Sequence, residues 1–582
     1  MAYRKGTLDD KKCFRKTASY GRSLSESVLD IPFPLAVANK LLDDFGFSEM
    51  VDSILDWDPK QCHISPGDAF KAIILRTASV KERPAIMNLH FAYLDMPLQL
   101  MFDTVRSPDD LDRFAIADHL DRLYEAGVSR IYSNVSATVR AHYDVVSKVA
   151  HSDTTSVNVW GDYISDYQND GGIDIVYGYS KDKRPDLKQF MVGNVVDDNG
   201  LIIYSKPLNG NTDDKVWNRM CLDAIESLLK EEDLIYVADS KVVTEQLIRR
   251  MNDADIRFVS RLPKNFGKNL QRRILEDVDP DSLKKMIKLK GEEKRVDRWY
   301  TETVVENDGI TLRAIPQVTS HNRGKGDKAL EKQREGFKKE LEAFRKLYAC
   351  EKDAKAAFDK FFKSMRGKYP FIVMEPTYHK VYTESRPKGR PRKDGSDVIR
   401  DVMTRIEITY TEDPDERDAV WKSEEFIVTI SNIPFVEDDP VRGEDAENVL
   451  RHYNEQWRAE GSFATVKSPA FVDALFLEKQ SRAEALVMLL NVGMLLRGLI
   501  QKLIRDGLKD IPDDSLPEYG VDNGRLQRNV THSYFINQFQ STNVHYFERA
   551  GEYVFSRRET AERAEFFMGL MGIDPSELFR TN

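Results

Sequence analysis

Polar and aromatic residues recur at a helical period between Tyr453 and Lys467, and they are of types that can do chemistry. Tyr453, Glu460 and Lys467 are seven residues apart, so a helix would place them on one stripe, with Trp457 close beside it. One face would then present a carboxylate, the kind of ligand that hard divalent cations require, between an aromatic hydroxyl and an ammonium. A solvated helix face with an incidental Glu/Lys stripe would give the same pattern.

Two further acids precede this stretch in settings that predict strands. Asp153 lies in the run from His151 to Val157, where alternating β-branched residues indicate a strand. Asp239 ends the apolar run 234–238 and precedes a predicted helix over 242–250. A buried strand followed by an acid and a helix is typical of α/β folds, whose sites gather at the carboxyl ends of strands. Asp239 also suits a helix N-cap, which is a purely structural role.

Taken together, the three acidic motifs resemble the Asp-Asp-Glu transposases of bacterial and archaeal insertion sequences. The match is to the insertion sequence four superfamily, whose third motif reads Tyr, two residues, Arg, three residues, Glu, six residues, Lys. Tyr453, Glu460 and Lys467 fit this spacing, but Gln456 stands where the pattern has Arg, and it brings neither a charge nor a bidentate fork. Other stretches that resemble the family are 64–69, 120–127, 180–190, 198–200 and 210–213.

This resemblance implies an α/β fold with a ribonuclease-H-like catalytic core, a helical N-terminal domain and a large mixed α/β insertion before the catalytic Glu helix. We expect a helical DNA-binding domain over residues 1–145, although a helical oligomerisation domain would give the same pattern. The remaining boundaries are the first part of the core over 146–262, the insertion over 263–440, the second part over 441–510, and a helical C-terminal region over 511–582.

The site residues and cofactor are also implied by the resemblance. Asp153 would bridge two Mg²⁺ ions, for which Mn²⁺ can substitute, and Asp239 and Glu460 would each bind one of them. Two such ions about 3.5–4 Å apart can activate an oxygen nucleophile and stabilise the leaving oxygen of a phosphodiester. Tyr453 and Lys467 would contact phosphates near the cleaved bond, and the phosphate-binding role of the family's Arg would fall to Gln456 or to Lys467 with nearby basic residues.

A basic segment within the predicted insertion resembles an AT-hook. It contains Lys388, Gly389, Arg390, Arg392 and Lys393 around a Gly-Arg-Pro-Arg core. Such a core can lie extended in a narrow minor groove, whose negative potential attracts Arg side chains. A solvated basic loop between strands would have the same composition.

Composition limits the remaining function classes. The 582-residue chain carries a net charge of −10, which argues against indiscriminate coating of DNA and favours local basic clusters. Four cysteines without close pairs suit a reducing cytoplasm and give neither a disulfide framework nor a zinc site. The apolar stretch 485–500 is shorter than the ~20 residues of a bilayer span and predicts a buried helix.

We therefore expect a cytoplasmic, nucleoid-associated transposase without a membrane partner. It would bind double-stranded DNA at terminal inverted repeats, cleave it and join it to target DNA, acting as a homodimer because two ends must be synapsed. A non-catalytic DNA-binding protein derived from a transposase is one alternative, and a ribonuclease-H-like nuclease without strand transfer is another.

Replacing Arg390 and Arg392 together with Ala should weaken binding to AT-rich DNA and flatten its salt dependence. Each Arg that neutralises a phosphate releases counterions, with a log–log slope of roughly −0.9 per contact. Titrations of an AT-rich duplex at several salt concentrations measure this slope. An unchanged slope would exclude a minor-groove role for the segment.

Overall fold

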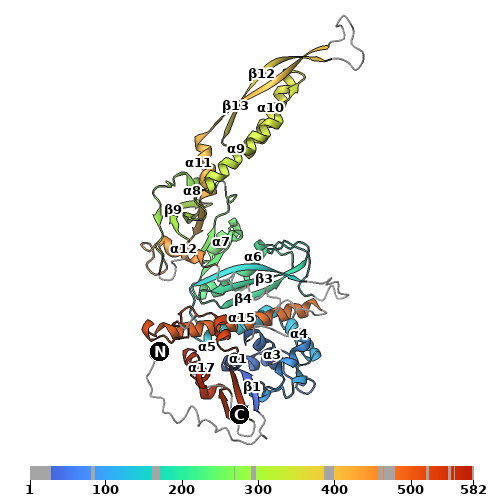
Figure 1. Ribbon diagram of the computed structural model, residues 1–582, viewed down its shortest axis with the longest axis vertical. Helices are drawn as coiled ribbons and strands as arrows, with labels where there is room; N and C mark the ends of the chain where they lie inside the picture. Colours follow the sequence, from blue (N-terminus) through green and yellow to red (C-terminus); the bar gives the residue numbers. More distant parts are fainter. Residues whose placement is uncertain are drawn as a thin grey trace. The chain divides into compact units, whose positions relative to one another are not determined.

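The chain folds into two compact units in the computed structural model (Figure 1). The structure describes residues 28–79, 86–159, 171–267, 269–289, 296–385, 399–456, 463, 479–519, 524–547, 552–555 and 558–579. Unit 1 comprises residues 1–242, 254–256 and 454–582, and unit 2 comprises 243–253 and 257–453. The predicted mixed α/β class is confirmed in the described part of the chain.

Unit 1 contains strands in the order β4-β3-β2-β5. Their bounds are β2 Val149–Val159, β3 Lys188–Asp197, β4 Ile202–Leu208 and β5 Ile235–Ala238. The first three are antiparallel neighbours, whereas β5 pairs parallel with β2 after the crossover helix α6, Asp214–Glu231. A parallel neighbour requires such a crossover and a strand covered on both faces. Accordingly β2 is buried along its length except at Asp153 and Asn158, which are half-buried.

The helix α15, Gln480–Lys509, forms the centre of unit 1 (Figure 1). Its buried residues cover every face between Ala485 and Leu496 and one stripe beyond that, and it packs against β4, the N-terminal helices and α17. Among the described residues it is the one helix long and apolar enough to cross a membrane, yet 83% of its apolar window is buried inside the protein. The predicted buried helix over 485–500 is therefore confirmed.

The N-terminal segment is helical beyond β1 in its described residues, as predicted, and the core that those residues form is shared. Its side chains share one hydrophobic cluster with α15, the strands and the C-terminal helices. The strand β1, Val28–Pro32, pairs with β15, Asn543–Phe547, and this pairing between the two ends of the chain was not predicted. The other elements here are α1 Phe33–Asp44, α2 Phe47–Ile54, α3 Pro66–Ser79, η1 Ile86–Tyr93, η2 Leu98–Leu100, η3 Pro108–Leu111, α4 Arg113–Ala126, α5 Val128–His142, η6 Asp513–Ser515, α16 His532–Gln538, β16 Glu552–Phe555, α17 Arg558–Leu570 and η8 Pro575–Glu577.

Unit 2 combines a strand layer with a long arm. The strands run in the order β6-β14-β10-β8-β7, with β9 also paired with β10. The arm consists of α9 Lys325–Phe344 and α10 Glu351–Lys368 beside the antiparallel strands β12 Ile372–Ser385 and β13 Ile399–Glu412. The other elements are α7 Glu245–Asp253, β6 Phe258–Arg261, α8 Leu270–Glu276, β7 Lys284–Lys285, β8 Arg298–Tyr300, β9 Thr303–Asn307, β10 Ile310–Thr319, β11 Leu347–Tyr348, α11 Pro414–Glu425, β14 Ile427–Ser431 and α12 Ala446–Asn454.

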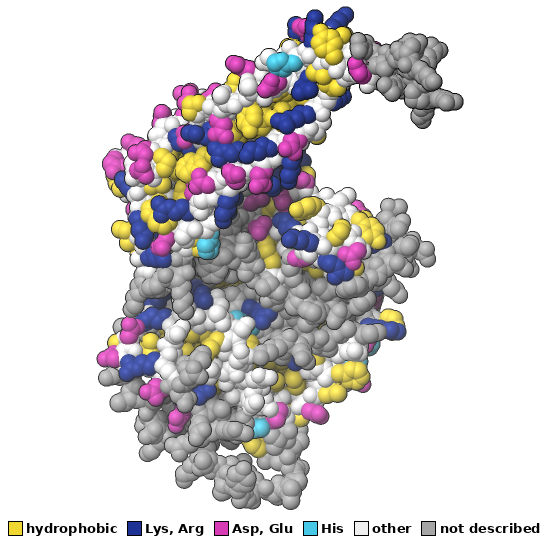
Figure 2. Space-filling model, turned by 45° about the horizontal axis from the view of Figure 1, so that its top comes forward, with side chains coloured by type: hydrophobic (Ala, Val, Ile, Leu, Met, Phe, Trp, Pro, Cys, Tyr) yellow, Lys and Arg dark blue, Asp and Glu magenta, His cyan; other side chains and the backbone are white. Residues whose placement is uncertain are grey.

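The arm has its own apolar core and a surface of mixed charge. Its cluster includes Leu330 and Phe337 of α9, which are seven residues apart, and Phe358 of α10. On the face seen in Figure 2, basic side chains alternate with acidic ones. Several are paired within the arm, among them Arg334 with Glu412 at 2.7 Å and Lys368 with Glu340 at 2.8 Å.

The predicted single helix from Tyr453 to Lys467 is wrong at its start. The helix α12 ends at Asn454, and Glu455 and Gln456 form a turn. Asn has a low helix propensity, and the helix buries Ala446, Val449 and Leu450 but no side chain after them. The end of the helix also coincides with the point where the chain returns to unit 1. Seven-residue spacing alone cannot reveal a turn within the span that it covers.

Gly193 on β3 lets α6 pack closely against the sheet. A Cβ atom at this position would lie 2.5 Å from the ring of Trp217, a fully buried side chain of α6. We predict that Gly193→Ala lowers the free energy of unfolding by about 1–3 kcal/mol, because the ring cannot move without disturbing the core. Urea unfolding of both proteins measures the difference. Gly569→Ala on α17, where nothing lies within 4 Å, should cause no loss.

Candidate active site

Asp153 lies on β2, and Asp239 directly follows the neighbouring parallel strand β5. In the register of β2 and β5, Ser152 is opposite Ala238, so the next residue of each chain segment is an aspartate. Asp239 follows the last residue of β5, where its Oδ1 accepts a hydrogen bond of 3.0 Å from the backbone N–H of Lys241. The sequence predicted both settings, and strand pairing brings the two acids together although they are 86 residues apart.

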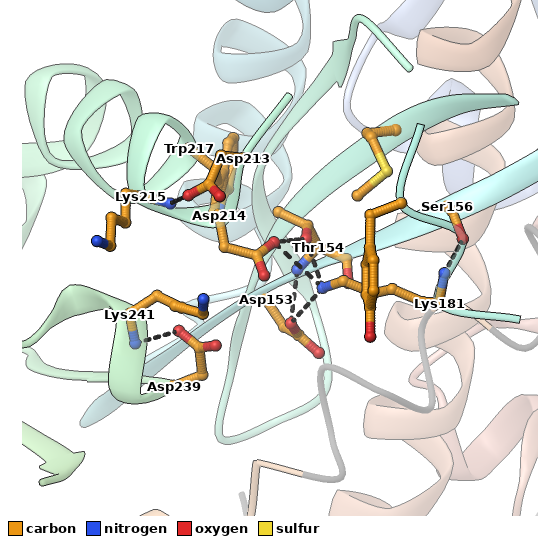
Figure 3. Close-up of polar contacts among 12 residues, drawn as sticks. Asp153, Thr154, Ser156, Lys181, Asp213, Asp214, Lys215, Trp217, Asp239 and Lys241 are labelled. Carbon is orange, nitrogen blue, oxygen red and sulfur yellow. Dashed lines mark hydrogen bonds and ion pairs between the residues drawn. The ribbon is translucent and has the colours of Figure 1, made fainter. Parts of the chain in front are cut away.

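A third acid and a lysine, for which no role was predicted, complete the cluster (Figure 3). Asp214, the first residue of α6, accepts a hydrogen bond of 2.5 Å from Thr154 Oγ1. The Lys181 ammonium lies 3.2 Å from Asp214 Oδ1 and 3.6 Å from Asp153 Oδ1. Both residues lie in or next to stretches that resemble the family, 180–190 and 210–213, which was the signal that could have pointed to them.

The loop that carries Lys181 is fixed by contacts along β2. The backbone N–H of Lys181 donates to Ser156 Oγ at 3.0 Å, and Ser180 Oγ donates to Asn158 Oδ1 at 3.2 Å. Ser156 and Asn158 are two residues apart and therefore point to the same face of β2. Together, these two hydrogen bonds set the register of the loop against the strand. The ammonium is thereby placed beside Thr154, whose carbonyl oxygen and Oγ1 accept from it at 2.8 and 2.7 Å.

A buried aromatic layer supports the other side of the cluster. Trp217 Nε1 donates a hydrogen bond of 3.0 Å to Ser152 Oγ, which joins α6 to β2 one residue before Asp153. The Asp213 side chain caps α6 by accepting from the N–H of Lys215 at 2.8 Å. These contacts fix the first turn of α6, and with it Asp214, against the strand that carries Asp153.

Burial and like charge oppose ionisation at this site. Burial is the main cause that raises the pKa of Asp153 to about 6, and Asp239 and Asp214 raise it further. The Lys181 ammonium and the N–H of Thr154, which donates to Asp153 Oδ1 at 2.7 Å, act in the opposite direction on that pKa. Burial likewise raises the pKa of Asp239, again with a contribution from Asp214. The negative charges of the carboxylates are therefore only partly balanced by neighbouring groups, and a bound cation would balance them further.

The donor set fits a divalent metal ion but is incomplete within the described residues. Carboxylate oxygens are the ligands that Mg²⁺ prefers. When ionised, the three aspartates and the one ammonium sum to two negative charges, which one divalent cation would balance. No group of three or more His, Cys, Asp or Glu side chains that could hold a metal is found in the part of the chain that the structure describes. Glu460, the third predicted ligand, lies outside that part.

The other predicted site residues divide into two groups. Tyr453, at the end of α12, and Gln456, in the following turn, are both half-buried. Lys467 and the segment with Lys388, Gly389, Arg390, Arg392 and Lys393 lie outside the described residues. The structure consequently brings together Asp153 and Asp239 and adds Lys181 and Asp214 to them.

Comparison with known families gave two matches. Residues 153–496, more than half of the chain, match the family described as transposase DDE domain. Residues 33–137 match a domain of unknown function (DUF4277). A search of curated proteins found no match. The transposase match begins at Asp153 and includes Asp239, Lys181, Asp214 and Glu460.

Replacing Asp153 with Asn should stabilise the metal-free fold at neutral pH. The carboxyl titrates near pH 6 in the folded protein and near 3.8 when unfolded, so the native state holds an extra proton between these values. The free energy of unfolding therefore falls as pH rises through this window, by up to about 3 kcal/mol, and Asn removes this loss. Urea unfolding with a chelator should give similar stabilities at pH 4 and a more stable variant above pH 6.

The exposed Asp223→Asn on α6 serves as the control for a general effect of removing negative charge. An Asp153→Asn protein less stable than the wild type at pH 7 would contradict the electrostatic account.

Proposed function

Because the chain belongs to the transposase DDE family, we propose that it binds the terminal inverted repeats of an insertion sequence, cleaves the DNA there and joins the ends to target DNA. The observation that carries this proposal is the pair of half-buried carboxylates, Asp153 on β2 and Asp239 directly after the adjacent parallel strand β5. Phosphodiester cleavage needs anionic oxygen ligands held in a fixed, partly desolvated position, and this pairing supplies two of them.

Members of this family generally use divalent metal ions, and we propose Mg²⁺ here, with Mn²⁺ able to substitute. When bound, such ions supply Lewis-acid stabilisation of the phosphodiester oxygens and lower the pKa of a water or hydroxyl nucleophile. Asp153, Asp239 and Glu460 would hold them. The N–H of Thr154 orients Asp153 through its bond to Oδ1, which leaves Oδ2 without a protein partner among the described residues.

DNA contacts are assigned to residues on both sides of the unit boundary. Tyr453, Gln456 and Lys467 would contact phosphates next to the cleaved bond. Unit 2 contains the residues 263–440 of the predicted insertion, together with α7 and β6. The segment 388–393 of that insertion would enter the minor groove of the transposon end. The N-terminal helices would add further end contacts, and two copies of the chain would synapse two ends. A cytoplasmic, nucleoid-associated protein follows from this role.

Three nearly isosteric substitutions test the proposed ligands. Asp153→Asn, Asp239→Asn and Glu460→Gln should each reduce metal-dependent cleavage at least about 100-fold, because a neutral amide oxygen cannot compensate a divalent charge. Cleavage and strand transfer on terminal-repeat DNA, end binding and melting temperature are measured on the same proteins. Binding and folding should survive in all three.

Asp223→Asn, exposed on the same helix as Asp214, provides the matched control and should cleave normally. Near wild-type cleavage by any of the three variants would remove that residue from the metal site. A wild-type chain that binds ends but never cleaves them would instead favour the non-catalytic alternative, and cleavage without joining would favour a nuclease.

A further inference from the structure

The Lys181 ammonium is held by four oxygens, and it is not bound equally to them. Thr154 O and Oγ1 are 2.8 and 2.7 Å away, and Asp214 Oδ1 is 3.2 Å away, all within hydrogen-bonding distance. Asp153 Oδ1 is 3.6 Å away, too far for a hydrogen bond. Lys181 therefore compensates Asp153 through its charge alone, while Thr154 and Asp214 hold it in place.

Fixing the loop does not require this side chain. The backbone N–H of Lys181 and the Ser180 hydroxyl already attach the loop to Ser156 and Asn158 on β2. The Lys181 side chain is also 73% buried, so its charge acts in a medium less polar than water. A partly buried ammonium that lies beside two carboxylates, on a loop that backbone and hydroxyl contacts also attach to β2, has an electrostatic role.

We propose that Lys181 is an internal counter-cation that competes with the divalent metal ion for the negative charge of Asp153. This inference rests on the proposed function, since it takes Asp153 as a metal ligand. A positive charge a few ångströms from a dication repels it, so Lys181 keeps metal affinity low in the DNA-free protein. Lys181 is accordingly a positioning residue: it sets the charge of the site and does not act on the reacting atoms.

Binding of metal without any reaction tests the proposal. Mn²⁺ is titrated calorimetrically into the DNA-free full-length chain at pH 8, above the pKa of about 6 that Asp153 has in the wild type. We expect Lys181→Met to bind Mn²⁺ more tightly than the wild type by roughly tenfold or more. Lys181→Arg keeps the charge and should remain within a few-fold of the wild type. Lys183→Met, an exposed neighbour two residues on, controls for loss of a lysine from the same loop.

Asp153→Asn separates failure of this inference from failure of the proposed function. If Asp153→Asn abolishes Mn²⁺ binding but Lys181→Met binds no more tightly than the wild type, the counter-cation role is overturned and the metal site stands. If Asp153→Asn binds as well as the wild type, the metal assignment of Asp153 fails, and the inference fails with it. Should Lys181→Met not fold, Lys181→Gln replaces it, because its amide can still donate to Thr154 O.

Discussion

Unit 1 depends on the burial of one helix on all of its sides. A helix that is apolar all round must be enclosed, and α15 is enclosed by the N-terminal helices, by β4 and by α17. Close approach is possible because glycines stand at the contacts: a Cβ atom at Gly493 would lie 2.2 Å from Thr77, and one at Gly507 would lie 2.4 Å from Leu570 O. The sheet with Asp153 and the segment 33–137 consequently share a single core, although each matches a different family.

Charged side chains also join the N-terminal helices to α15. Asp121 on α4 accepts hydrogen bonds from Arg482 Nε at 2.7 Å and from Lys479 Nζ at 2.9 Å, at the first residues of α15. Those bonds and the adjacent positive charges outweigh partial burial and lower the pKa of Asp121, so this acid stays ionised as part of an ion pair. Asp153 has the opposite balance, with too little positive charge for its burial. Two aspartates of one unit thus differ in their electrostatic balance because of their neighbours, and the proposed metal ion would compensate the charge of Asp153 but not that of Asp121.

Features that depend on residues close together in the chain could be predicted from the sequence, and contacts between residues far apart in the chain could not. The strand with Asp153, the acid after β5 and the buried helix within α15 are local patterns of hydrophobic period and turn chemistry, and they were predicted. The pairing of β1 with β15 and the contact of Lys181 with Asp214 join residues distant in the chain, and no periodicity encodes them. The predicted single helix through Tyr453 was wrong for a related reason. The seven-residue spacing is a local pattern, and it did not reveal the turn that follows Asn454, where the chain passes from unit 2 to unit 1.

The regular pairing of β12 with β13 has a consequence for reach. Fourteen residues of each strand are paired without a shift of register, and at about 3.3 Å per residue the ribbon is roughly 45 Å long. One turn of a DNA duplex is about 34 Å. The ribbon is thus longer than the helical repeat of DNA. The chain between Ser385 and Ile399 connects the two strands at the end where these two residues pair. A single copy of unit 2 has the length to touch two successive turns of one duplex.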